Sequence, residues 1–190
     1  MVTTRPQRAD ARRNRDRLLA EAAAAYFERG VDVPLEEIAR RSDVGIGTLY
    51  RHFPTRDALI EAVYRREVEL LCDAAEDLRR DLPPEQALEQ WLERFVDYVA
   101  TKRGMAEALK SIVGANSALF AESRQRFEDA ITGLVGAAAE VGVIRVDVEP
   151  MDLLRAISGI CMATQPVEGD WRDHALRLVG LLMDGMRYRA

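Results

Sequence analysis

The stretch that decides the fold is Arg41–Leu59, RSDVGIGTLYRHFPTRDAL. Each of its two glycines costs about 1 kcal/mol relative to alanine inside a helix, which argues against a long helix here. Apolar residues nevertheless recur as they would on one side of a packed element, at Val44, Leu49, Tyr50 and Phe53. The stretch could therefore be a loop, a phosphate-binding cradle or a short helix with an exposed function.

Turn signals bound this stretch. Phe53 precedes Pro54, and a proline pushes the residue before it out of the α region, so a short helix should end there. Thr55 can cap the helix that follows. Upstream, Pro34 suits the first position of another short helix. The sequence thus predicts two short helices joined by the turn at residues 42–44, and then a long helix.

The rest of the chain also has helical patterns. Ala9–Arg29 is amphipathic, with Phe27 among its apolar positions, and Gly30 is a plausible terminating glycine. GVIRVDVEP, residues 142–150, is β-like but too short for a sheet. We predict an all-α fold of about nine helices. The later helices are expected at Arg56–Arg80 (with Leu70 among its buried positions), Glu85–Lys102, Gly104–Val113, Ser117–Val141, Pro150–Ala163 and Trp171–Arg189.

Charge is distributed unevenly along the chain. The 190 residues carry a net charge of −5, yet residues 1–56 have 11 arginines against 8 acidic residues. Six of these arginines lie in the first 17 residues. Such asymmetry indicates an anion-binding end. Its partner could be nucleic acid or a membrane, or the N-terminal arm could simply be a solvated segment.

Composition and short motifs also limit which classes of protein this chain can belong to. Cys72 and Cys161 form no C-x-x-C motif, which favours a reduced, cytoplasmic protein. We find no signal peptide and no apolar run of membrane-spanning length. His52 and His174 are the only histidines, and neither belongs to a catalytic or metal-binding motif. We therefore expect no enzymatic activity, no metal site and no cofactor.

The two short helices form a helix-turn-helix pattern. Thr48, Arg51 and His52 are expected on the side opposite the apolar residues, and a helix with such a face can enter a major groove about 12 Å wide. Gly47 would let DNA approach the backbone closely. A nucleotide cradle fits poorly, because no strand precedes the glycines and no Gly-Lys-Ser/Thr follows them. A purely structural tight turn remains an alternative.

Val33–Tyr64, VPLEEIARRSDVGIGTLYRHFPTRDALIEAVY, resembles the DNA-binding domain of the TetR family of transcriptional regulators. The most specific matches are at Ile38-Ala39, Val44, Thr48-Leu49-Tyr50, Phe53 and the following Arg56 and Leu59. The resemblance implies a recognition helix at about Gly45–His52. The residues that match the family's DNA-contact positions are Ile46, Gly47, Thr48, Tyr50, Arg51, His52 and Arg56.

Several residues depart from the family pattern. Arg56 replaces a usual lysine, which keeps the charge for a phosphate contact. Pro34 replaces a threonine that often contacts phosphate, and Asp43 replaces the usual glycine of the turn. Gly45 and Ile46 replace serine and lysine. Among the contact positions, Arg51 is the best candidate for a bidentate contact with guanine, whereas Thr48, Tyr50 and Arg56 are expected at phosphates.

The resemblance divides the chain into a DNA-binding domain, residues 1–56, and an effector-binding and dimerisation domain, residues 57–190. Trp91, Phe95 and Tyr98 are the preferred lining of a pocket for a small apolar or amphipathic effector, although aromatic residues at helical spacing also suit an ordinary core. The last two long helices would form a homodimer interface, or else internal core.

An isologous dimer predicts a palindromic DNA operator, from which the effector would release the repressor. The alternative is a helical binding or scaffold protein whose helix-turn-helix reads no specific sequence.

Overall fold

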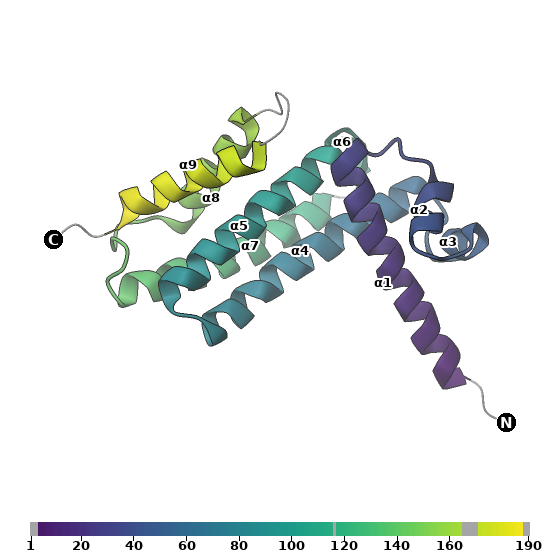
Figure 1. Ribbon diagram of the computed structural model, residues 1–190, viewed down its shortest axis with the longest axis horizontal. Coiled ribbons are helices and arrows are strands. Elements are labelled where there is room, and N and C mark those ends of the chain that lie inside the picture. Colours follow the sequence, from purple (N-terminus) through teal and green to yellow (C-terminus); the bar gives the residue numbers. More distant parts are fainter. Residues whose placement is uncertain (1–3, 116, 165–170, 188–190) are drawn as a thin grey trace. The chain divides into compact units, whose positions relative to one another are not determined.

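The computed structural model describes residues 4–115, 117–164 and 171–187, and within these ranges the chain is all-α (Figure 1). This confirms the predicted fold class. The only β-type pairing in the described ranges is an isolated antiparallel bridge between Ile144 and Arg187. The helices there are α1 (Thr4–Arg29), α2 (Leu35–Arg41), α3 (Ile46–His52), α4 (Arg56–Asp81), α5 (Pro84–Gly104), α6 (Ala106–Ala115), α7 (Ser117–Glu140), α8 (Pro150–Ala163) and α9 (Trp171–Met186).

The chain forms two compact units. The N-terminal unit comprises residues 1–67 and 101–117, and the C-terminal unit comprises residues 68–100 and 118–190. Helices α4 and α5 therefore each contribute residues to both units. These units are defined by contacts between residues. The expected domains, residues 1–56 and 57–190, are defined by function, so the two divisions describe different properties of the chain.

Local sequence signals fix the first three helices. The N–H of Gly30 bonds to the carbonyl of Tyr26 at 2.9 Å, and Gly30 has a φ of +75°, which confirms it as the glycine that ends α1. Pro34 immediately precedes α2 and is its N-cap residue. α2 and α3 both pack on α1 and on each other. Their shared core is apolar and includes Leu18, Leu19, Ile38, Leu49 and Leu59.

The core of the C-terminal unit is formed by α4, α5, α7, α8 and α9. Its fully buried side chains include Trp91, Leu92, Ile131, Ile157 and Cys161. No helix in the described part of the chain is long and apolar enough to cross a membrane.

Two residues predicted to face a core are exposed. Phe27 has an exposed fraction of 46% and Leu70 one of 51%. Phe27 directly follows the buried Tyr26, and Leu70 directly precedes the buried Leu71. Helical spacing identifies the buried side of a helix only approximately, and the packing of neighbouring helices decides where burial ends.

Candidate nucleic-acid interface

A tightly bonded turn joins α2 to α3. The hydroxyl of Ser42 donates to the carbonyl of Ile38 at 2.7 Å, and the N–H of Val44 donates to the carbonyl of Ala39 at 3.0 Å. Asp43 between them adopts the left-handed conformation, with a φ of 52°. Aspartate tolerates this conformation better than most residues do. The turn predicted at residues 42–44 is therefore present, with Asp43 in place of the usual glycine.

Helix α3 is short because both its ends are fixed. The carbonyl of Gly45 accepts bonds from the N–H groups of Thr48 and Leu49 at 2.8 and 3.1 Å, which starts the helix. Phe53 is extended, with φ −135° and ψ 92°, and ends it before Pro54. Leu49 and Phe53 are buried together with Val44 of the turn. The inward side of α3 is thus the apolar side predicted from the sequence, except that Tyr50, which the apolar pattern groups with these residues, is 45% exposed.

The opposite side of α3 faces solvent. Ile46, Gly47, Tyr50 and Arg51 are exposed, while Thr48 and His52 are half-buried. A Cβ atom added at Gly47 would meet no atom within 4 Å, so the backbone there is open to an incoming surface. Arg51 makes no ion pair with any described residue. Six of the seven predicted contact residues therefore lie together on one short helix.

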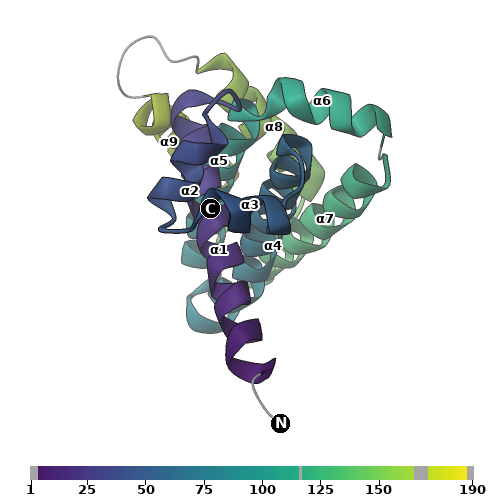
Figure 2. The ribbon, with the colours of Figure 1, turned by 90° about the vertical axis from the view of Figure 1, so that its right-hand side faces the viewer.

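The N-terminal half of α1 adds positive charge beside this helix. It extends past α2 and α3 within the N-terminal unit (Figures 1 and 2). The Arg15 guanidinium lies 5.5 Å from the ring centre of Phe53, and Arg17 lies 3.9 Å from the Asp43 carboxylate. These contacts place this part of α1 beside the turn and the end of α3. The side chains of Arg5 and Arg8 lie outside the described residues.

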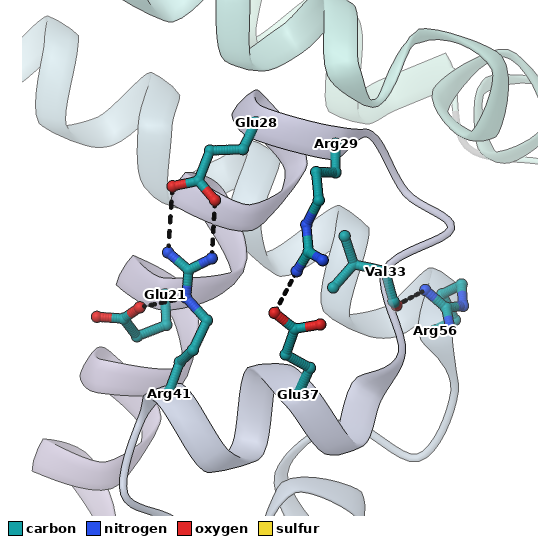
Figure 3. A network of polar contacts seen from close by, with 7 residues as sticks. All are labelled: Glu21, Glu28, Arg29, Val33, Glu37, Arg41 and Arg56. Carbon is teal, nitrogen blue, oxygen red and sulfur yellow. Dashed lines mark hydrogen bonds and ion pairs between the residues drawn. The ribbon is translucent and has the colours of Figure 1, made fainter.

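Ion pairs fix α2 against α1 (Figure 3). Arg41 of α2 reaches two carboxylates of α1, Glu21 at 3.1 Å and Glu28 at 2.9 Å, and at the other end of α2 Glu37 pairs with Arg29. The hydrogen bond from Arg41 lowers the pKa of the Glu28 carboxyl. Sequence periodicity did not reveal this network, because pairs 8 to 20 residues apart form only once the helices have packed.

Arg56, the seventh predicted contact residue, has structural partners. Its Nη1 atom donates to the carbonyl oxygen of Val33 at 2.7 Å and also to that of Val31. The side chain is half-buried and joins the start of α4 to the loop between α1 and α2 (Figure 3). Any phosphate contact would have to use the other guanidinium nitrogens.

Two family models match the chain. The model for bacterial regulatory proteins of the tetR family matches residues 18–63, which include the whole helix-turn-helix. The model for the C-terminal domain of SbtR-like transcriptional regulators matches residues 83–188, more than half of the chain. The chain belongs to the TetR family of transcriptional regulators. Its N-terminal helix-turn-helix is accordingly a DNA-binding one, and the family consists of regulators rather than enzymes.

Solved TetR structures match most of the chain. A TetR transcriptional regulator from Streptomyces coelicolor is 46% identical and has a TM-score of 0.84, with 93% of this chain and 99% of that chain covered. A TetR regulatory protein from Mycobacterium vanbaalenii is 33% identical with a TM-score of 0.75, covering 96% and 100%. Curated HTH-type transcriptional regulators from Staphylococcus aureus are 32% identical over 75 residues, which is 39% of this chain and 40% of their own length.

In this TetR-family chain, the three residues predicted to line a pocket lie together in a packed aromatic cluster. The rings of Trp91 and Phe95 stack at 5.6 Å, and Tyr98 and Phe95 both contact Phe127, at 5.0 and 6.1 Å between ring centres. The Trp91 indole N–H donates to the carbonyl of Leu71 at 2.8 Å. All three predicted residues are buried. The rings fill the space between their helices.

Proposed function

We propose that this TetR-family regulator is a homodimeric repressor that binds a palindromic operator through α3. The observation that carries the proposal is the exposed face of α3, where Arg51 has no carboxylate partner among the described residues. Arginine in that position can pair bidentately with the O6 and N7 atoms of guanine. The functional division into residues 1–56 for DNA and residues 57–190 for effector binding and dimerisation is part of this proposal.

Selecting the duplexes that the protein binds from a random DNA library tests sequence-specific DNA recognition directly. We expect enrichment of one palindromic sequence, with an affinity that falls steeply as salt rises, because phosphate contacts release counterions. Arg51→Ala should weaken binding by about 10- to 100-fold and relax the preference at one base pair. Thr48→Ala should weaken binding to all sequences alike.

The matched control is Arg94→Ala, which removes an exposed arginine from α5. This variant should bind the selected operator like the wild type. If Arg51→Ala also did so, the assignment of α3 would be wrong. If no duplex were enriched even at low salt, the alternative of a helical binding protein without sequence-specific DNA recognition would be favoured.

The dimer is proposed to form through α8 and α9. These helices pack on each other and leave Met162 and Leu181 exposed, at 72% and 67%. Large apolar side chains that are this exposed on two neighbouring helices are typical of a protein–protein interface. A two-fold dimer would bring two α3 helices about 34–36 Å apart, which is one turn of DNA and the basis for expecting a palindrome.

The effector is proposed to be a small apolar or amphipathic molecule that binds at the cluster of Trp91, Phe95 and Tyr98. Trp91, Phe95 and Tyr98 are buried, so a ligand has to displace at least one ring, such as the half-buried Phe127. It can release the operator only if it binds the two conformations of the protein with different affinities. A screen for compounds that dissociate the selected operator tests this, and Phe127→Ala should strengthen the binding of a hit by making room.

A further inference from the structure

Ile46 is a large apolar residue on the exposed face of α3, where a DNA-binding surface usually has polar or charged side chains. It is the first residue of α3, and 37% of this large apolar side chain is exposed. Its neighbours in the chain are Gly45 and Gly47, and a Cβ atom added at either would meet nothing within 4 Å. The two residues next to Ile46 in the chain therefore have no side chain that could shield it from an approaching molecule.

A second apolar group continues this surface. Tyr50 follows Ile46 by four residues, so the two lie on the same side of the helix, and 45% of Tyr50 is exposed. Leu49, which points inward, is fully buried. The outward side of α3 thus has an apolar strip, Ile46 and Tyr50, and next to it lies Arg51, which forms no ion pair with a described residue.

The chemistry of base edges limits what such a strip can contact. In the major groove, guanine, adenine and cytosine present hydrogen-bond donors and acceptors, and the C5-methyl group of thymine is the one apolar group. The isoleucine side chain has no donor or acceptor. Placed against a polar base edge, it would leave that edge without a partner, which is unfavourable in a water-excluding interface.

We propose that Ile46 is a specificity-determining residue that contacts the methyl group of a thymine in each half of the operator. The inference rests on the proposed function, because it requires α3 to lie in the major groove. It further specifies the base read at the N-terminal end of α3. The occupant is duplex DNA because the strip belongs to the exposed surface of the helix-turn-helix and because the exposed Arg51 follows Tyr50 on the same helix.

Deoxyuridine substitution isolates the methyl group. Uracil pairs as thymine does but lacks the C5-methyl, so each thymine of the selected operator is replaced in turn. At one symmetry-related position we expect the wild type to lose about fourfold in affinity per half-site, corresponding to the loss of one buried methyl group. Ile46→Ala should bind the thymine and uracil operators equally well, and Ile46→Val should retain part of the discrimination.

Two controls separate the possible outcomes. Thermal unfolding should show that Ile46→Ala remains folded at the assay temperature, with a smaller loss of stability than a core substitution causes, because 37% of the side chain is exposed. Tyr50→Phe, which keeps the ring, should retain the response to uracil at the Ile46 position. Equal responses of the wild type and Ile46→Ala at every thymine would overturn this inference while leaving the proposed DNA binding intact. Failure to enrich any duplex would overturn both.

Discussion

Gly104, the last residue of α5, lies directly against the backbone of Tyr26 in the last turns of α1. A Cβ atom at Gly104 would overlap the carbonyl oxygen of Tyr26 and would stand 2.9 Å from its carbonyl carbon. Both residues belong to the N-terminal unit. The close approach of these two backbones requires glycine, since no other residue leaves the space empty.

Gly104→Ala should therefore destabilise the protein. The obstacle is backbone rather than a flexible side chain, so relief requires one helix to shift, at a cost of about 1–3 kcal/mol in the free energy of unfolding. Urea denaturation measures this. The control is Gly136→Ala in α7, where an added Cβ meets nothing within 4 Å, and the substitution should stabilise by up to about 1 kcal/mol. Equal effects of the two substitutions would contradict the prediction.

Arg56→Met should lower stability as well as affect DNA binding. The substitution removes the charged donor bonded to the carbonyls of Val31 and Val33, and hydrogen bonds to charged groups contribute about 1.5–3 kcal/mol. Denaturation without DNA isolates this structural role. Arg40→Met, at an exposed position on α2, is the control and should change stability by less than about 0.5 kcal/mol.

Tyr26 should make stability depend on alkaline pH. Burial raises the pKa of its phenol from 10.0 to about 12, partly offset by the Arg56 charge. The folded state therefore holds this proton more tightly than the unfolded state. The associated stability is complete below pH 10 and is lost, by about 2–3 kcal/mol, as pH rises towards 12.

Tyr26→Phe checks this assignment. The variant should lose that part of the decline in unfolding free energy between pH 10 and 12. The Tyr26 hydroxyl is buried with no hydrogen-bond partner among the described residues. At neutral pH the phenylalanine variant should therefore be as stable as the wild type or up to about 1–2 kcal/mol more stable. An unchanged alkaline slope would show that other groups cause the decline.

Trp91→Phe should destabilise the C-terminal unit. The substitution removes the indole N–H that donates to the Leu71 carbonyl at 2.8 Å. It also leaves a cavity beside Phe95. Leu71 lies inside α4, where its carbonyl also accepts a helical hydrogen bond, so the lost indole bond should cost about 0.5–1.5 kcal/mol, measured by thermal or urea unfolding. A variant as stable as the wild type would mean that the indole bond contributes nothing.

Leu181→Glu should weaken the proposed homodimer. A charge placed on the exposed apolar face of α8 and α9 would be buried without a partner in the dimer, which should raise the dissociation constant at least 10-fold. Sedimentation velocity over a dilution series measures this. Val146→Glu changes a side chain that is 84% exposed but lies outside both helices, and it should leave the dimer intact.

The sequence predicted the local features of this protein well because each has a local cause. Gly30 ends α1, Asp43 adopts the left-handed turn and Pro54 stops α3, and all of these depend on the backbone preferences of single residues. The buried side of α3 followed from the spacing of Val44, Leu49 and Phe53. The resemblance at Val33–Tyr64 supplied the family, which the comparisons confirmed.

Only the tertiary structure decided the partners of residues far apart in the chain. In the folded protein, Arg56 donates to two carbonyls, and Arg41 pairs with both Glu21 and Glu28. Trp91, Phe95 and Tyr98 pack in one aromatic cluster with Phe127. The tertiary structure also exposed Phe27 and Leu70, which helical periodicity had assigned to a core. Periodicity fixes which residues share a side of one helix, but burial and long-range hydrogen bonds depend on which other helix packs against that side.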